Sequence, residues 1–150
     1  MHAYWSAYPQ DQIFGANYNA FSTKWTGSCE ANPEYEPEDM ELAVKWAIFS
    51  AAEQNTTPMT TTLILPAWDQ HSNTSYLKWT EKFPEHAILL ARIPKKLFKF
   101  CTPDAWTGGP QYAGNPKWDV NILIIGNEKG LHQIHTSLNE HELRDRRAHV

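Results

Sequence analysis

Two apolar segments constrain the fold of this chain more than any other feature. Thr60–Trp68 carries the continuous run Leu63-Ile64-Leu65, and Lys117–Gly126 is a second, longer apolar segment. A strand with one face in water alternates apolar and polar residues, whereas a continuous run suits a sheet buried on both faces. Both segments are therefore predicted to be strands, the first of them within a sheet that is covered on both sides.

Helical segments separate the predicted strands. Pro37 suits the first position of a helix, and Glu38 and Asp39 would occupy the first turn, where the helix dipole favours anions. This helix is predicted to run to about Asn55. Its apolar residues are spread around most of the circumference, which predicts a helix covered on more than one side. A second, short helix is predicted at Ser75–Phe83.

The remaining elements complete an alternating α/β pattern. Further strands are predicted at Gln12–Gly15, Gly27–Asn32, His86–Ile93 and Lys96–Phe100, a long loop at Cys101–Asn115, and an amphipathic helix beginning at Leu131. Alternating strands and helices followed by a strand-rich end predict the second half of a doubly wound sheet. We therefore expect one α/β domain over residues 1–130 and a C-terminal helix with a polar tail over residues 131–150.

Charge and composition exclude several classes of protein. The net charge of −4 argues against wholesale binding to a phosphate backbone, and two cysteines are too few for a disulfide framework. The longest apolar runs, such as Ile122–Ile125, are far too short to cross a membrane. His132, His135 and His141 lack the spacing of a zinc site, so no metal is expected. These features predict a soluble, intracellular protein.

The run Asn32-Pro33-Glu34-Tyr35 is the segment with the clearest chemical meaning. The amide oxygen of Asn32 and the carbonyl of Pro33 could accept both N–H groups of an exocyclic adenine amine, which directs its lone pair toward a methyl donor. Tyr35 could stack on the base, a contact worth roughly 1–3 kcal/mol. The alternative is an ordinary turn, because an Asn-Pro pair often begins one.

The flanking sequence adds a family resemblance over about residues 4–127. The segments that carry it are Tyr4–Pro9, Phe14-Gly15, Phe21, Gly27-Ser28, Glu30–Pro33, Ile64–Trp68, Phe98–Phe100 and Gly126-Asn127. In this order and spacing they resemble the phosphorylated-CTD-interacting-factor type of mRNA cap-adenosine N6-methyltransferase. The resemblance implies a Rossmann-like class I methyltransferase fold, S-adenosylmethionine as the cofactor, and nucleic acid as the substrate. RNA, modified at a cap-proximal adenosine, is favoured over DNA, and a eukaryotic protein of this kind would be nuclear.

The resemblance also implies roles for individual residues. Asn32, Pro33, Glu34 and Tyr35 would form the catalytic motif, with Asn32 also contacting the cofactor. Asp11 follows Pro9 where the family carries acidic residues, and its carboxylate would bind cofactor hydroxyls.

Two departures from the family leave the activity of this chain open. Glu34 stands where the family has a second proline, and Tyr35 where it usually has phenylalanine. In the family, a strand and a turn that hold the cofactor precede the segment that begins here at Tyr4, so the fold is expected to be incomplete on its N-terminal side. A non-catalytic binding or assembly subunit, and a piece of a longer enzyme, therefore remain as alternatives.

Candidate substrate-binding residues lie on two later segments. Trp68 follows a predicted strand and would line the base or cap pocket, although a packed tryptophan at the sheet edge fits equally well. Lys95, Lys96 and Lys99, together with Arg92, form a basic cluster with aromatic residues between them. That arrangement suits phosphate contacts, and its alternative is a solvated surface.

The predicted strand at Gly27–Asn32 raises a question of pairing. If the strand before it in a doubly wound sheet is absent, one of its edges is left open, and an open edge invites pairing with another chain. Either Gln12–Thr23 closes this edge, or a partner chain or a further segment does. The second possibility is the one we expect.

Overall fold

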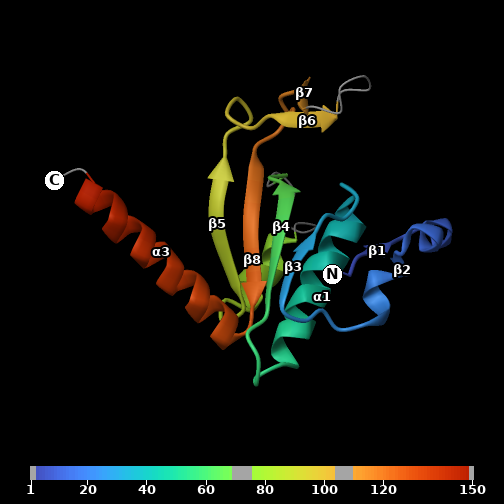
Figure 1. The fold of residues 1–150 in the computed structure, drawn as a ribbon, viewed down its shortest axis with the longest axis horizontal. Helices are drawn as coiled ribbons and strands as arrows, with labels where there is room; N and C mark the ends of the chain where they lie inside the picture. The colour runs from blue at the N-terminus through green and yellow to red at the C-terminus, as the bar shows by residue number, and fades with distance from the viewer. Residues whose placement is uncertain (1–2, 69–75, 104–109, 149–150) are drawn as a thin grey trace.

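The centre of the molecule is a sheet of four strands in the order β3-β4-β8-β5 (Figure 1). The computed structural model describes residues 3–68, 76–103 and 110–148. The strands are β3 (Ser28–Ala31), β4 (Thr60–Pro66), β8 (Val120–Gly126) and β5 (Ala87–Ile93). β3 and β4 run parallel, whereas β8 is antiparallel to both of its neighbours. The chain is therefore a mixed α/β protein, and the four strands correspond to four of the predicted ones.

Helix α1 (Pro37–Ala52) connects β3 to β4 and covers one face of the sheet (Figure 1). It begins at Pro37, with Glu38 and Asp39 in its first turn, as predicted. Its buried face consists mainly of small residues, including Ala43, Ala47 and Ala51. Short side chains allow the helix axis to approach the sheet closely, and the resulting core contains Leu63, Leu65, Leu123 and Ile125.

A second side of α1 is covered by the segment that precedes β3. The Trp46 indole Nε1 donates to the carbonyl of Thr23 at 2.9 Å, and the Phe21 ring meets the Trp46 ring edge-on with 6.3 Å between centroids. Phe49 lies against the Trp46 ring on this same side, with 5.2 Å between ring centroids, and Leu42 and Phe49 remain 41% and 43% exposed. The helix is thus covered by the sheet and in part by the segment that precedes β3, in agreement with its dispersed apolar residues.

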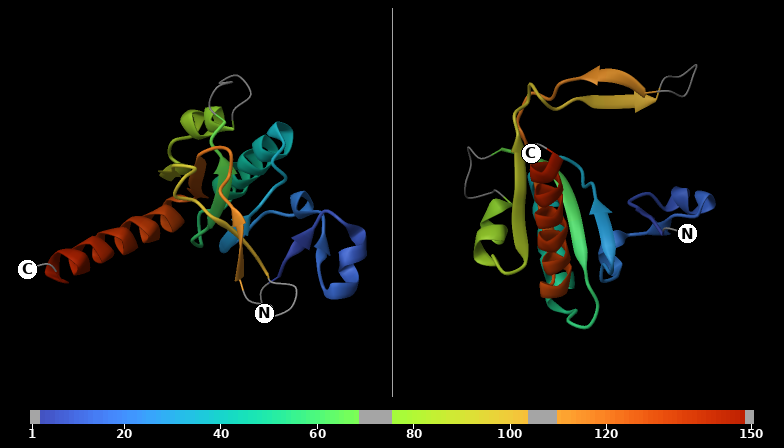
Figure 2. Two further views of the ribbon diagram at one scale, coloured as in Figure 1. Left: turned by 90° about the horizontal axis from the view of Figure 1, so that it is seen from above. Right: turned by 60° about the vertical axis from the view of Figure 1, so that its left-hand side comes forward.

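The opposite face of the sheet is less covered than predicted. Ile64 and Ile122 lie side by side across β4 and β8, and both remain partly exposed. The C-terminal helix α3 (Glu128–Ala148) buries Leu131 in its first turn and then projects away from the sheet (Figures 1 and 2). A continuous apolar run is therefore compatible here with a sheet that is fully packed on the α1 face alone.

The N-terminal segment lies beside β3, outside the four-stranded sheet (Figure 1). Its elements are β1 (Trp5–Ser6), the 3₁₀ helices η1 (Pro9–Phe14) and η2 (Ala20–Ser22), and β2 (Asn17–Tyr18). The predicted strand at Gln12–Gly15 is wrong, because Pro9 begins a helical turn there and Gly15, with a φ of 87°, ends it. β1 and β2 pair with each other, so within the described ranges Gln12–Thr23 does not close the outer edge of β3.

The segment between β5 and β8 also differs from the prediction. Residues 95–97 form a turn, with the Leu97 N–H donating to the Pro94 carbonyl at 2.8 Å, so the strand predicted at Lys96–Phe100 is wrong. The predicted loop at Cys101–Asn115 contains a hairpin of β6 (Phe100–Pro103) and β7 (Pro110–Gly114). Pro103 and Pro110 sit at strand ends, where the missing N–H is tolerated. This hairpin lies beyond the end of the sheet (Figures 1 and 2).

The short helix α2 (Leu77–Lys82) falls within the predicted range Ser75–Phe83 and lies next to α1 and β5. In the three described ranges, no helix combines the length and apolar character needed to cross a bilayer. Those ranges also contain no group of three His, Cys, Asp or Glu side chains positioned to hold a metal ion.

Candidate functional site

The candidate site lies at the end of the sheet where β3 and β4 finish. We call this end of the sheet the rim. The two strands are parallel and in register, with Ala31 opposite Leu63, so the residues that follow them emerge at the same edge. β8 enters there in the opposite direction, with Val120 opposite Pro66 and the Ala67 N–H donating to the Asp119 carbonyl at 2.8 Å. The rim therefore joins three segments, namely residues 32–35, 67–68 and 118–119.

The Asn-Pro motif occupies the β3 part of the rim. Asn32 and Glu34 are exposed, whereas Pro33 and Tyr35 are half-buried. The Tyr35 hydroxyl lies 3.5 Å from the Ile64 carbonyl on β4, a long contact that orients the ring across the strand ends. Burial raises the pKa of Tyr35, so its hydroxyl stays protonated and able to donate at neutral pH. Asn32 is therefore exposed to solvent three residues before a tyrosine whose ring lies across the strand ends.

Three aromatic side chains form a continuous cluster at the rim. The Tyr35 and Trp118 rings meet edge-on with centroids 6.3 Å apart, and the Trp68 and Trp118 rings meet edge-on at 5.3 Å. We call Tyr35, Trp68 and Trp118 the rim aromatic cluster. Edge-to-face pairs at this spacing are favourable, and they hold the rings in defined orientations. The tyrosine of the motif and the predicted Trp68 are thus brought together, with Trp118 between them.

Trp118 was not identified from the sequence. It comes just before β8, and the antiparallel pairing of β8 with β4 is what brings it to the strand ends. Its indole Nε1 is buried and has no hydrogen-bond partner in the described part of the chain. A buried unpaired donor costs about 1–3 kcal/mol, and such groups are rare in folded proteins. The sequence signal was the placement of a tryptophan directly between a Pro/Gly-rich segment and an apolar strand.

Two buried polar side chains, Tyr76 and Asn121, fix the backbone next to the rim. The Tyr76 hydroxyl donates to the Pro66 carbonyl at 2.9 Å and accepts from the Asn121 side-chain amide at 3.0 Å. Tyr76 is 3% exposed, and this burial raises its pKa to about 12. The other end of the Asn121 amide, Oδ1, is buried without a partner among the described residues. This pair fixes the end of β4 from which Trp68 extends.

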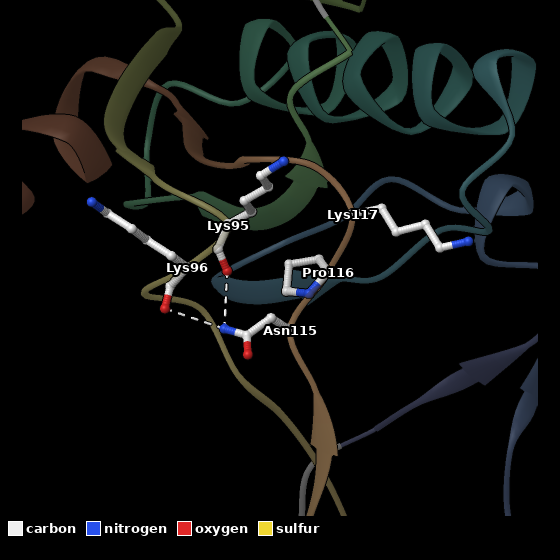
Figure 3. A pocket seen from close by; sticks show the side chains of 5 residues that line it. All are labelled: Lys95, Lys96, Asn115, Pro116 and Lys117. Atoms are coloured by element: carbon white, nitrogen blue, oxygen red, sulfur yellow. Dashed lines mark hydrogen bonds between the residues drawn. The ribbon is translucent and has the colours of Figure 1, made fainter.

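The predicted basic cluster lies on the turn beside the rim. Lys95 and Lys96 line a shallow hollow of about 440 Å³ with Asn115, Pro116 and Lys117 (Figure 3). The Asn115 amide donates to the carbonyls of Lys95 at 3.1 Å and Lys96 at 3.2 Å, which shapes the turn. The ammonium groups of Lys95, Lys96 and Lys117 point in three different directions (Figure 3). Such a spread suits several phosphates of a chain better than one isolated anion.

Asp119 connects this turn to the rim. Its carboxylate accepts the Lys95 backbone N–H at 2.9 Å and pairs with the Arg92 guanidinium at 3.4 Å. The Lys95 N–H, together with Arg92, lowers the pKa of Asp119. The carboxylate therefore remains ionised and holds the turn against the first residues of β8. Lys99 is exposed on the segment that leads to β6, and it does not line the hollow.

Asp11, the proposed cofactor-binding residue, lies in the N-terminal segment and not among the three rim segments. It lies in η1, and its carboxylate accepts the Ser6 hydroxyl at 2.5 Å within the N-terminal segment. β1 and β2, which flank η1 in the chain, lie on the far side of β3 from β4 (Figure 1). The structure thus joins Tyr35 and Trp68 through Trp118 and places Lys95 and Lys96 on the neighbouring turn, whereas Lys99 lies outside the hollow and Asp11 belongs to the N-terminal segment.

Comparison with known proteins does not extend this description. Neither models of protein families nor the curated proteins gave a match to this chain.

Proposed function

We propose that this chain is the adenine-holding part of an S-adenosylmethionine-dependent adenine-N6 methyltransferase that acts on nucleic acid, with RNA favoured over DNA. The observation that carries the proposal is the position of Asn32-Pro33 and Tyr35 at the end of β3, directly beside the rim aromatic cluster. The α/β architecture supports it, since ligands in open α/β sheets sit beyond the carboxyl ends of the strands. The parallel pair β3–β4 followed by β8 is compatible with half of a Rossmann-like methyltransferase sheet.

The proposed roles follow from the exposed groups of the motif. The Asn32 side-chain oxygen and the Pro33 carbonyl accept the two N–H groups of adenine N6, and Tyr35 holds the base by its ring. Binding both hydrogens aligns the nitrogen lone pair, and much of the rate enhancement would come from this positioning. S-adenosylmethionine would supply the methyl group as an electrophile.

The residues described do not assemble a complete cofactor site. Asp11, the carboxylate expected to bind cofactor hydroxyls, accepts the Ser6 hydroxyl within the N-terminal segment, whose strands lie on the far side of β3 from β4. The outer edge of β3 is not paired with any strand in the described ranges, and an added strand would bring new residues next to Asn32. We propose that the rest of the cofactor site comes from a segment or partner chain that pairs with this edge.

The engagement of Asp11 by Ser6 and the unpaired edge of β3 also favour one alternative, a non-catalytic subunit that binds nucleic acid. In that role Glu34 would not impair function, because no methyl transfer would depend on the residue after Asn32-Pro33. The two functions differ in what they require of the motif. Methyl transfer requires the Asn32 amide, whereas a binding subunit requires only the rim aromatic cluster and the lysines.

The experiment that tests the proposal is calorimetric titration of the chain with S-adenosylmethionine and S-adenosylhomocysteine. It is followed by a methyl-transfer assay on adenosine-containing RNA, with capped, uncapped and DNA forms of one oligonucleotide as substrates. Saturable binding and an N6-methyladenosine product that Asn32→Ala abolishes are the expected results, with Asn55→Ala, an exposed residue after α1, as the matched control. Turnover that survives in Asn32→Ala would overturn the catalytic assignment. A chain that binds RNA and neither cofactor would support the binding subunit.

A further inference from the structure

Three lysines surround one tryptophan on helices α1 and α2, outside the rim itself. The Nζ atoms of Lys45, Lys82 and Lys78 lie 4.9, 5.1 and 5.6 Å from the centroid of the Trp79 ring. Cations within about 6 Å of an indole are attracted to its ring electrons. We call Lys45, Lys78, Lys82 and Trp79 the Trp79 lysine patch. Lys45 belongs to α1 and the others to α2, so two elements build it.

Trp79 is held firmly in this position. Its indole Nε1 donates to the Glu41 carboxylate at 2.8 Å, and its ring stacks on Phe83 with 6.4 Å between centroids and an interplanar angle of 7°. Glu41 also pairs with Lys78 at 3.2 Å. The indole N–H, with Lys78, lowers the pKa of Glu41, so the carboxylate that anchors the ring stays ionised.

The patch is positive although the chain as a whole is negative. Among the described residues, three ammonium groups lie around Trp79 and one carboxylate, that of Glu41, pairs with one of them, whereas the net charge of the chain is −4. A local positive surface on a negative protein attracts polyanions to that place and repels them elsewhere. The patch therefore attracts a polyanion and also determines where on the protein surface it binds.

The patch is also close to the rim. α1 begins immediately after the rim residue Tyr35, and Glu41 and Lys45 lie about one and about two helical turns along it, or roughly 6 and 12 Å. A single strand whose adenine is held at the rim could thus continue along α1 and α2. Basic side chains that track a backbone beside aromatic rings are typical of single-strand binding surfaces.

We propose that the Trp79 lysine patch binds phosphates of a single-stranded nucleic acid next to the adenosine held at the rim. This inference rests on the proposed function, which places an adenosine of the nucleic acid at the rim. Its test measures RNA binding and does not depend on methyl transfer. The lysines supply the affinity, which is independent of sequence, while the rim selects the base.

The test is fluorescence anisotropy with a labelled RNA of about 12 nucleotides, a length within the range that single-strand binding folds cover. The variant Lys45→Gln/Lys82→Gln removes two charges from exposed positions. The matched control is Lys24→Gln/Lys129→Gln, which removes two charges near the opposite end of the sheet, where these lysines contact Glu53 and the Thr56 carbonyl. Circular dichroism checks that each variant is folded.

The patch variant should bind about tenfold more weakly, and the slope of log affinity against log salt should become shallower by about 1.4, because each phosphate contact on a single strand contributes about 0.7. The control variant should change neither quantity by as much. Equal loss in both variants, an unchanged slope, or equally tight binding of poly-glutamate would overturn the proposal. A labelled DNA of the same sequence shows whether the sugar matters.

The two proposals can fail separately. RNA binding that depends on the patch, in a chain without methyl transfer, would overturn the proposed function and leave the patch standing. The opposite result is methyl transfer to a capped dinucleotide at the same rate in the patch variant and the parent, with RNA affinity also unchanged. It would support the proposed function and overturn the role of the patch.

Discussion

The two ends of the sheet are built in opposite ways. At the end away from the rim, Asn127 is 3% exposed and its amide makes four hydrogen bonds. Its Oδ1 accepts the N–H groups of Met59 and Gly130, and its Nδ2 donates to the carbonyls of Gln54 and Thr57. This single side chain caps α3 and ties it to the connection between α1 and β4. At the rim, by contrast, the Trp118 indole N–H is buried without a partner among the residues that the structure describes.

Packing follows the same division. A Cβ on Gly130 would lie within 2.1 Å of the Met59 carbonyl oxygen, so the Asn127 end has no room for another carbon atom. The rim instead exposes Asn32 and Glu34 and borders an open hollow at Lys95. At the Asn127 end the amide is fully bonded and closely packed, although the Thr61 hydroxyl near it is buried without a partner among the described residues. The rim instead carries exposed polar side chains. The following predictions test this division, from the largest expected effect on stability to the smallest.

Asn127→Ala should lower the free energy of unfolding by about 4 kcal/mol, because it leaves two buried N–H groups and two carbonyls without their partners. Urea unfolding followed by tryptophan fluorescence measures this change. Asn55→Ala, at an exposed position in the same connection, should alter it by less than about 0.5 kcal/mol. Similar values for the two variants would show that the Asn127 end does not hold the fold.

Gly130→Ala should cost about 3 kcal/mol, because the added methyl group meets the Met59 backbone, which cannot move without disturbing β4. His132→Ala, two residues later on the exposed surface of α3, is the control and should be nearly neutral. Thermal unfolding of both variants distinguishes crowding from a general effect of alanine in this helix. A neutral Gly130→Ala would mean that the two ends are packed alike.

Tyr76→Phe should cost about 2 kcal/mol by leaving the Pro66 carbonyl and the Asn121 amide unpaired. The native pKa of about 12 also predicts a pH dependence. Because this value is above the usual pKa of tyrosine, near 10, the contribution is fully present below about pH 10. It is lost as the pH rises toward 12. Unfolding measured from pH 9 to 12 should show this loss in the parent and a smaller one in Tyr76→Phe.

Trp118→Phe should change the free energy of unfolding by less than about 1 kcal/mol, because the donor that it removes has no partner within the described ranges. Affinity for adenosine-containing RNA should fall about fivefold if a ligand uses that donor, and anisotropy measures the change. Trp46→Phe, which removes an indole N–H bonded to Thr23, is the opposite case and should destabilise without affecting RNA. A large loss of stability in Trp118→Phe would show that Trp118 stabilises the fold as Asn127 does, and would contradict the difference between the two ends of the sheet.

The regular elements were predictable because each carries a local signal. Pro37 with two acidic residues marked the start of α1, and Leu63-Ile64-Leu65 marked β4. The segments whose structure was predicted wrongly lack such signals or carry misleading ones. The sequence predicts a strand where η1 lies, although Pro9 and Gly15 can delimit a helical turn, and the prolines at the ends of β6 and β7 predict a loop in place of that hairpin. Short elements depend on a few bonds, such as that from Asn115 to Lys95, which no periodicity reveals.

The sequence by itself determined the four strands of the central sheet, the main helix and the position of the Asn32-Pro33 motif at a strand end, because burial periodicity and capping residues act over a few neighbouring positions. Only the tertiary structure brought Trp118 between Tyr35 and Trp68, kept Asp11 away from the rim, and placed three lysines around Trp79. These arrangements depend on which strand enters the sheet beside which, and in which direction. The antiparallel entry of β8 is decided by the packing of the whole core, so no local segment encodes it.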